Sequence, residues 1–240
     1  MLVNEIFTSF QGEGTSVGMP CTFLRLSVCN LHCKWCDTWY AWNFGKGDGI
    51  EERHGAKTVK MKDESHEQTI KQVGDKLIEL KTKNLVITGG EPLLQQKELD
   101  ELFIYLMAAG KLPEVIEIET NGTVALEPEI VPWITQINCS PKLENSGNDK
   151  TARYRPEVLK QYQKITRAFF KFVATNELDL LEIDGIIKEC DLLNVILMAE
   201  GKTKDEQEQN QQKIAHLART RGWNFSPRLH ILLYDTQRGK

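Results

Sequence analysis

The sequence lacks several features that would place it in a broad class at once. No apolar run in its 240 residues approaches the length of about 20 residues that a membrane-spanning helix needs, so we expect no membrane association. The 30 Lys and Arg residues do not outnumber the 34 Asp and Glu residues, and the net charge of −4 argues against a nucleic-acid binder. Tandem repeats, low-complexity tracts and linkers are also missing, so residues 1–240 are predicted to form a single domain.

A signal peptide is not evident either. The first residues, "MLVNEIFTSF", lack a charged start and an uninterrupted apolar stretch. We therefore expect a cytoplasmic protein, in which thiols stay reduced and can bind metal. Of the six cysteines, Cys21, Cys139 and Cys190 stand alone in apolar surroundings, where a cysteine is usually a small buried side chain.

Strand-like and helix-like stretches alternate along most of the chain. Strands are expected at 21–28, 84–90, 114–122, 134–142, 168–174, 193–199 and 229–234, and helices at 66–83, 97–110, 156–165, 177–190 and 204–222. Regular alternation predicts parallel strands joined by crossover helices. About six such units are too few for an eight-fold barrel, so the predicted fold is α/β, an open partial (β/α)6 barrel of the TIM type.

One segment interrupts this alternation. Residues 42–65 contain Gly45, Gly47, Gly49 and Gly55 among charged residues, with little apolar periodicity. They are predicted to form a long loop inserted after the cysteine-rich stretch, and loops of this length are often functional.

The remaining cysteines lie close together in "VCNLHCKWCDTWYAW". Cys29, Cys33 and Cys36 can point inward from one tight loop and hold three irons of a [4Fe–4S] cluster, which leaves the fourth iron open. The alternative is a zinc site completed by His32, Asp37 or a distant residue. The spacing favours the cluster, because a zinc site of this kind usually has a second ligand pair downstream.

Polar residues follow the predicted strands at the ends where parallel α/β folds bind ligands. These ends carry "TGGEP", "ETNG" and "SPK". Gly89 and Gly90 would let the backbone approach a ligand closely. Alone, "TGGEP" could be a strand–turn–helix start, and "ETNG" a simple turn.

Together, the Cys-x3-Cys-x2-Cys loop, Trp35 before its last cysteine and "GGEP" resemble the radical S-adenosylmethionine (SAM) superfamily. The resemblance implies the partial barrel described above, and that SAM chelates the fourth iron. An electron from the cluster would cleave SAM to a 5′-deoxyadenosyl radical, which abstracts hydrogen from the substrate. The cofactor would carry the difficult chemistry, and the protein would supply geometry and a dry site.

A narrower resemblance comes from "FQGEG", Arg25 and "CDT" together with "TGGEP" and "SPK". These pieces are similar to the 7-carboxy-7-deazaguanine synthase family. That family implies a lyase of queuosine and 7-deazapurine biosynthesis that converts 6-carboxy-5,6,7,8-tetrahydropterin to 7-carboxy-7-deazaguanine, with loss of ammonia and with Mg²⁺. A glycyl-radical-enzyme activase of the same superfamily and a non-catalytic zinc-binding module are the alternatives.

The resemblance also implies roles for individual residues. Cys29, Cys33 and Cys36 would hold the cluster, and Thr38 would bind Mg²⁺, with Asp37 as a rival ligand. The implied SAM contacts are Trp35, Asp37, Gly90, Ser140, Pro141 and Lys142, and the implied substrate contacts are Phe10, Gln11, Gly12, Glu13, Arg25 and Thr88. Glu119 and Asn121 are second-tier candidates.

Three of these residues have plainer interpretations. Arg25 could form an ordinary ion pair, and Thr38 or Asp37 could cap the following turn.

The family further implies an electron donor such as flavodoxin and a homodimer. Two late stretches, "SPRLH" and the basic end "DTQRGK", are further candidates for contacts to the site.

Overall fold

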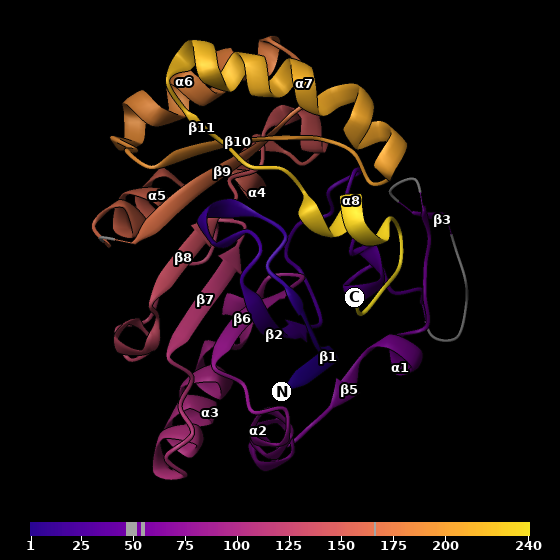
Figure 1. Ribbon diagram of the computed structural model, residues 1–240, viewed down its shortest axis with the longest axis vertical. Coiled ribbons are helices and arrows are strands. Elements are labelled where there is room, and N and C mark those ends of the chain that lie inside the picture. The colour runs from indigo at the N-terminus through magenta and orange to yellow at the C-terminus, as the bar shows by residue number, and fades with distance from the viewer. Residues whose placement is uncertain (47–51, 54–55, 166) are drawn as a thin grey trace.

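The computed structural model describes residues 1–46, 52–53, 56–165 and 167–240 (Figure 1). In this part of the chain a nine-stranded sheet has the order β11-β10-β9-β8-β7-β6-β2-β1-β5. Its strands are β1 (Leu2–Phe10), β2 (Pro20–Leu26), β5 (His66–Glu67), β6 (Asn84–Gly89), β7 (Val115–Thr120), β8 (Gln136–Cys139), β9 (Ala168–Ala174), β10 (Val195–Ala199) and β11 (Asn224–Phe225). From β2 to β11 all neighbours are parallel, whereas β1 pairs antiparallel with β2 and β5.

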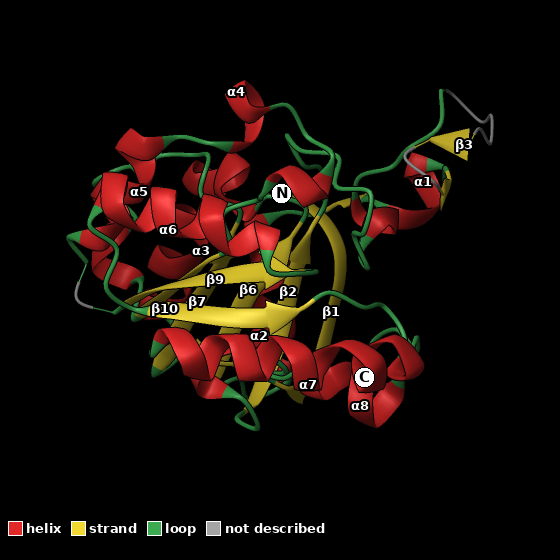
Figure 2. Cartoon of the chain, turned by 90° about the horizontal axis from the view of Figure 1, so that it is seen from above, coloured by secondary structure: helices red, strands yellow, loops and turns green. Residues whose placement is uncertain are grey.

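The connections between the parallel strands carry α2 (Ile70–Glu79), α3 (Gln96–Ala108), α4 (Lys150–Arg153), α5 (Pro156–Gln163), α6 (Leu178–Cys190) and α7 (Lys204–Arg221). Two further helices lie elsewhere: α1 (Met61–Glu64) precedes β5, and α8 (Leu229–Tyr234) follows β11. Seen from above, the strands lie between α5 and α6 on one side and α7 on the other (Figure 2). This is the predicted α/β architecture with a parallel sheet, consistent with an open partial barrel.

Local sequence explains where the longer helices begin and end. Thr69 starts α2 with a capping box, in which its side chain accepts from the Gln72 amide, and Thr203 starts α7 in the same way with Glu206. α7 ends at Gly222, whose φ of 70° suits a residue without a Cβ.

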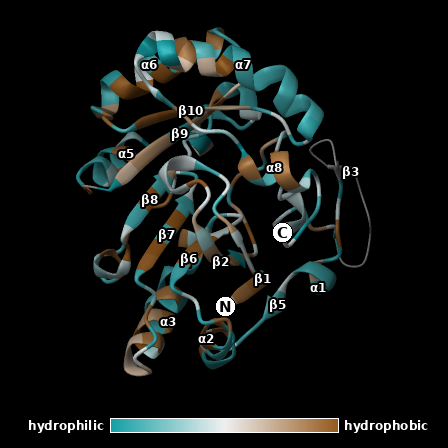
Figure 3. Cartoon of the chain, viewed as in Figure 1, coloured by the Kyte–Doolittle hydropathy of each residue, from teal (hydrophilic) through white to brown (hydrophobic). Residues whose placement is uncertain are grey.

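The main core fills the space between the sheet and these helices, with fully buried aliphatic and aromatic side chains from β2, β6, β7, β9 and α3. In Figure 3, β7 is hydrophobic and α7 is largely hydrophilic. The three isolated cysteines Cys21, Cys139 and Cys190 are buried and free, as predicted.

Several elements differ from the expectation. His66–Glu67 form strand β5, although a helix was predicted over 66–83. Residues 229–234 form helix α8 instead of a strand, because a short apolar run without alternation is compatible with either element. The sheet ends at β11, and α8 packs on α7 and buries Ile231. The N-terminal strand β1 was not anticipated.

The predicted excursion contains short elements. The short strands β3 (Glu52–Arg53) and β4 (Ala56–Lys57) pair antiparallel and are followed along the chain by α1 and then by β5. Residues 47–51 and 54–55, with Gly47, Gly49 and Gly55, lie outside the described residues. Within the described chain, no helix combines the length and the apolar character needed to cross a bilayer.

Candidate active site

One pocket at the carboxyl ends of the parallel strands collects nearly all the predicted site residues. Its lining includes Phe10, Gln11, Gly12, Glu13, Arg25, Cys29, Cys33, Trp35, Cys36, Asp37, Thr38, Thr88, Gly90, Glu119, Asn121, Ser140 and Lys142. Pro141 is the one predicted residue outside this lining. These residues come from the end of β1 and the loop after it, from β2 and the loop after it, and from the ends of β6, β7 and β8, so the fold places distant segments around one cavity.

The cysteine loop presents three thiols to this pocket, and each sulfur accepts a hydrogen bond. The Leu31 amide lies 3.4 Å from Cys29 Sγ, Asn148 Nδ2 lies 3.2 Å from Cys33 Sγ, and Trp42 Nε1 lies 3.3 Å from Cys36 Sγ. N–H donors to cysteine sulfur are what iron–sulfur ligation uses to stabilise thiolate charge. This donor set fits a cluster held by three thiolates. Among the described residues, no group of three or more His, Cys, Asp and Glu side chains is arranged to hold a single metal ion.

The backbone that enters the cysteine loop is unusual. Val28 has a φ of 77°, a conformation that β-branched residues rarely adopt. Its amide donates to the Ala41 carbonyl, and its carbonyl accepts from the Glu91 amide. These two bonds hold Val28 in place and set the direction of Cys29.

Gly89 and Gly90 of "TGGEP" were expected to let the backbone approach a ligand. In the structure they approach the backbone of the segment Leu26–Val28 closely. A Cβ on Gly89 would lie 2.0 Å from the Leu26 carbonyl oxygen, and a Cβ on Gly90 would lie 2.0 Å from the Val28 carbonyl oxygen. Only glycine fits at either position, because no L side chain tolerates such contacts. The pair therefore packs the end of β6 against the start of the cysteine loop.

Three predicted SAM contacts from two segments are linked to one another. Lys142 Nζ donates to Ser140 Oγ at 2.8 Å and lies 5.5 Å from the centre of the Trp35 ring. The Trp35 indole donates to the backbone and side-chain oxygens of Asn145 at 3.1 Å. The end of β8 is thus held against the cysteine loop.

Behind the cysteines lies the fully buried carboxyl of Glu91. It accepts hydrogen bonds from the amides of Asn121 and Leu93 and from Thr120 Oγ1. Burial outweighs these bonds and raises its pKa to about 7. Asn121 also forms an Asx turn with Thr123, which agrees with the simpler interpretation of "ETNG", but its Nδ2 lies 3.9 Å from Cys29 Sγ as well.

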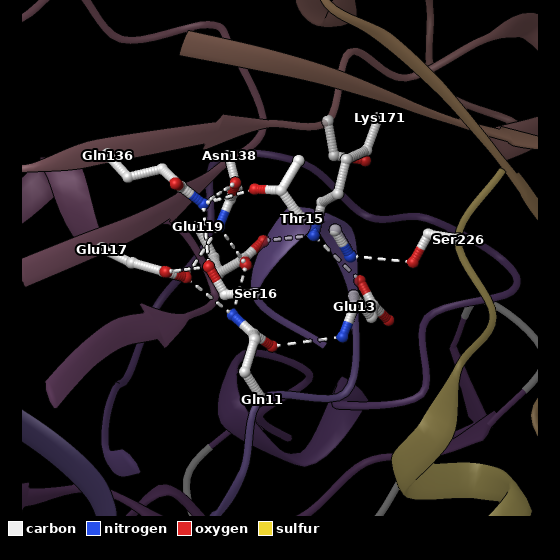
Figure 4. A network of polar contacts seen from close by, with 12 residues as sticks. Gln11, Glu13, Thr15, Ser16, Glu117, Glu119, Gln136, Asn138, Lys171 and Ser226 are labelled. Atoms are coloured by element: carbon white, nitrogen blue, oxygen red, sulfur yellow. Dashed lines mark hydrogen bonds and ion pairs between the residues drawn. The ribbon is translucent and has the colours of Figure 1, made fainter. Parts of the chain in front are cut away.

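A buried polar network of side chains from β7 and β8 holds the "FQGEG" loop in place (Figure 4). Gln11 Nε2 donates to Glu117 and Glu119 at 3.1 and 3.0 Å, and Asn138 Nδ2 donates to the same two carboxylates. The Gln11 side-chain oxygen accepts from the Glu13 amide at 3.3 Å. The Gln11 side chain therefore fixes the loop through the barrel interior, and so is engaged before any ligand arrives.

Glu13 lies between two cations. One of its oxygens is 3.0 Å from Lys171 Nζ and the other is 3.0 Å from Arg228 Nε. Lys171 also pairs with Glu119 at 2.5 Å and is 1% exposed. Burial favours the neutral acid, but Lys171 and Arg228 outweigh it and hold the pKa of Glu13 well below its usual range.

Asp37 and Thr38 differ in what they offer to a metal. Asp37 is paired with Arg228 Nη2, and His230 Nε2 lies 3.9 Å away. Burial opposes ionisation of Asp37, yet Arg228 and His230 keep its pKa well below the usual range. Thr38 precedes a 3-10 turn at Trp39–Ala41 without capping it through its side chain, and its hydroxyl lies 3.6 Å from Cys36 Sγ. The capping interpretation of Thr38 is therefore wrong.

Arg25 does form the ion pair that was one of its two interpretations. Its Nε lies 2.8 Å from Glu5 Oε1, and its guanidinium carbon lies 5.8 Å from the centre of the Phe7 ring. The Tyr40 hydroxyl donates to the same Glu5 oxygen at 3.2 Å. Arg25 thus lines the pocket in a fixed orientation.

Several pocket residues were missed by sequence reasoning. Lys171 is a charged residue in the middle of the apolar stretch "AFFKFVA". A charge inside a predicted buried strand could have marked it as a site residue. Arg228 and His230 lie in "SPRLH", where a Cβ on Gly12 would come within 2.2 Å of His230 Nδ1. A side chain at position 12 would therefore displace His230, a constraint that the motif "FQGEG" does not reveal.

Comparison with known proteins places this arrangement in a family. The Radical SAM superfamily profile matches residues 25–136. A 7-carboxy-7-deazaguanine synthase from Pyrobaculum aerophilum is 33% identical over 243 residues, which cover 99% of this chain and 96% of the relative. The chain belongs to the 7-carboxy-7-deazaguanine synthase family of radical SAM enzymes. A second synthase, from Hyperthermus butylicus, is 30% identical and covers 96% of this chain and 92% of its own length.

The fold agrees with a solved structure. The crystal structure of QueE from Escherichia coli superimposes with a TM-score of 0.67 at 24% sequence identity, covering 95% of this chain and 94% of that one. Family membership makes this chain a lyase that uses a [4Fe–4S] cluster and SAM, which the three hydrogen-bonded thiols fit. The zinc-module and glycyl-radical-activase alternatives are set aside.

Proposed function

We propose that this enzyme converts 6-carboxy-5,6,7,8-tetrahydropterin to 7-carboxy-7-deazaguanine and ammonia, with the whole chain acting as one domain. The product is the one in the names of its synthase relatives. The observation that carries the assignment is a single pocket with three thiols in its lining, together with the Glu13 carboxylate of "FQGEG" and the Arg25 guanidinium. Such a pocket suits a small, planar substrate that carries a carboxylate.

In this proposal Cys29, Cys33 and Cys36 hold the cluster. SAM would lie beside Trp35, Asp37, Gly90, Ser140, Pro141 and Lys142, where the Ser140–Lys142–Trp35 contacts already order the wall. Together the bound groups supply the one-electron chemistry that starts hydrogen abstraction from the substrate. The protein supplies orientation and keeps water out.

The substrate would lie across Phe10, Gln11, Gly12, Glu13, Arg25 and Thr88, with Glu119 and Asn121 at the rim. Arg25 uses Nε for Glu5, and its terminal nitrogens suit the substrate carboxylate. Each Glu13 oxygen is paired with a cation but keeps a second lone pair, which can accept a hydrogen bond from the guanidine-like edge of the pterin. Lys171 and Arg228 position Glu13 for that contact.

Mg²⁺ would bind through the Thr38 hydroxyl and oxygen atoms of the substrate. Asp37 is the weaker candidate, because Arg228 already neutralises it. Mg²⁺ prefers oxygen ligands and keeps several waters, so one hydroxyl plus a substrate carboxylate is a sufficient site.

The remaining proposals concern partners and location. The cluster needs an electron from a carrier such as flavodoxin, and we propose a homodimer in the cytoplasm, where the free thiols stay reduced. No nucleic-acid or membrane partner is proposed.

The decisive test is anaerobic reconstitution followed by turnover. The protein should contain iron and sulfide at about four each per chain, cleave SAM when reduced, and form 7-carboxy-7-deazaguanine from the carboxypterin. Cys33→Ala should lose iron and turnover, whereas the matched control Cys190→Ala, at a buried cysteine far from the loop in sequence, should keep both. SAM cleavage without pterin conversion would contradict the proposed substrate and favour an activase.

A further inference from the structure

The end of the chain lines the same pocket as the N-terminal motifs. After α8, residues 235–240 turn back toward the segment that carries α1 (Figure 1). All six of these residues contribute to the pocket lining, as do Glu64 at the end of α1 and Tyr40. Three segments that are far apart in sequence therefore meet at one part of the pocket wall.

Arg238 joins these segments. Its Nη1 and Nη2 lie 3.0 and 2.7 Å from the two carboxylate oxygens of Glu64, a bidentate pair. Its guanidinium carbon lies 3.5 Å from the centre of the Tyr40 ring, at stacking distance. A planar guanidinium that is both paired and stacked loses little further freedom, so each contact reinforces the other.

Further contacts connect Arg238 and Tyr40 to Arg25, the residue proposed to bind the substrate carboxylate. The Tyr40 hydroxyl donates to Glu5, and Glu5 pairs with Arg25. A Cβ on Gly239 would lie 3.8 Å from the other Glu5 oxygen, so the tail itself reaches the partner of Arg25. Glu64 also accepts from Asn4 Nδ2 of β1 at 3.3 Å, which anchors α1 to the sheet.

We propose that Arg238 is a positioning residue that clamps the tail, residues 235–240, to Glu64 of the inserted segment and to Tyr40 of the cysteine loop, and so completes the substrate side of the pocket. This inference rests on the proposed function for its substrate, but the clamp itself does not. Release of the tail would remove the pocket wall beside Arg25 and leave the part of the pocket lined by the three cysteines intact. The expected effect is therefore on pterin binding, with SAM cleavage preserved.

The chain offers a closely matched control. Arg221 pairs with Asp184 and lies 5.6 Å from the centre of the Trp223 ring, on α7 and α6 and outside the pocket lining. This second cluster contains the same three kinds of group: a guanidinium, a carboxylate and an aromatic ring. Asp184→Asn thus repeats the chemical change of Glu64→Gln at a place where no pocket effect is expected.

The first experiment is limited trypsin digestion, which needs neither cluster nor substrate. Trypsin must take the Arg238 side chain into its specificity pocket, which the clamp prevents. In Glu64→Gln, cleavage after Arg238 should accelerate by about tenfold, while cleavage after Arg221 stays unchanged. Asp184→Asn should show the converse. Equal cleavage after Arg238 in wild type and Glu64→Gln would overturn the clamp, whatever the enzyme's substrate proves to be.

The second experiment measures turnover in the reconstituted enzyme. Arg238→Gln and Glu64→Gln should raise KM for the carboxypterin by about tenfold with little change in kcat, and Asp184→Asn should change neither. The charge swap Glu64→Arg with Arg238→Glu should recover part of the loss, which a general folding defect would not. Unchanged KM in both single variants, with trypsin protection of Arg238 lost in Glu64→Gln, would refute the substrate-positioning role. Absence of any pterin turnover in wild type would instead refute the proposed function.

Discussion

Thr38 follows the last cysteine by two residues, and its hydroxyl lies in the pocket close to Cys36 Sγ. We expect Thr38→Ala to raise the Mg²⁺ concentration needed for half-maximal activity by about tenfold or more, because a direct oxygen ligand is lost. Thr38→Ser keeps the hydroxyl and is the matched control. Titration of activity with Mg²⁺ distinguishes them, and an identical Mg²⁺ response in wild type and Thr38→Ala would remove Thr38 from the metal site.

Glu91 gives a prediction about pH. Burial raises its pKa from 4.5 to about 7, so the folded chain holds a proton that the unfolded chain releases above 4.5. The contribution of Glu91 to stability is full below that value and decreases as pH rises toward about 7, by at most roughly 1.4 kcal/mol per pH unit.

Glu91→Gln cannot ionise and should lack this slope. It should also be less stable by about 1–3 kcal/mol, because its amide group cannot accept from both the Asn121 amide and Thr120. Urea unfolding of the iron-free chain across this pH range measures both effects. Parallel pH profiles for the two proteins would show that Glu91 is ionised in the fold.

At the scale of elements, the end of β6 and the cysteine loop act as one unit through Gly90. Gly90→Ala would place a methyl group 2.0 Å from the Val28 carbonyl oxygen. We expect a loss of about 1–3 kcal/mol in stability and a several-fold lower iron content after reconstitution, because Cys29 is displaced.

Gly185→Ala is the contrasting control. It lies inside α6, and a Cβ added there would have nothing within 4 Å, so the methyl group should stabilise the chain by about 0.5–1 kcal/mol and leave iron binding unchanged. Iron analysis and urea unfolding report the two quantities separately. Full iron content in Gly90→Ala would contradict the coupling.

Sequence patterns predicted elements well where the pattern was long or its ends were marked. Ala168–Ala174 is a strand with the predicted bounds, and α6 and α7 begin within a residue of the predicted starts. The apolar run 229–234 was misassigned because six residues carry too little periodicity to distinguish helix from strand. The predicted helix at 66–83 is shorter in the structure, since Thr69 caps it.

The candidate site was predictable where its residues lie in local motifs. The cysteines, "FQGEG", "TGGEP" and "SPK" all reach the pocket. Lys171 and Arg228 were missed because their partner Glu13 is 158 and 215 residues away, and no local pattern encodes such a pairing. Burial of a charge next to its partner is decided by the assembled fold.

At the scale of the whole molecule, Arg228 ties the C-terminal region to both Glu13 and Asp37. Arg228→Gln would leave two partly buried carboxylates without this cation and should cost about 3 kcal/mol near neutral pH. Both carboxyls have lowered pKa values, so the stabilisation is present above their ordinary values of 4.5 and 3.8 and is lost as pH falls below them.

The gap in stability between wild type and Arg228→Gln should therefore narrow in acid. Arg221→Gln, which removes the more exposed pair with Asp184, should cost less than about 1 kcal/mol and serves as the control. Urea unfolding at a series of pH values gives both curves. A gap that stays constant with pH would mean that Arg228 acts by packing alone.

Gly12 lies against His230, and its carbonyl accepts a hydrogen bond from the Leu229 amide. These contacts determine when the pocket can form during synthesis of the chain. A chain is synthesised from its N-terminus, and its early segments begin to fold first. The β1–β2 hairpin and the cysteine loop can form while the ribosome is still working, but the "FQGEG" loop meets its final neighbours only after residue 230 has emerged. The pocket is thus the last region of the molecule to be completed, and a chain interrupted before that point would display its thiols without an enclosed substrate site.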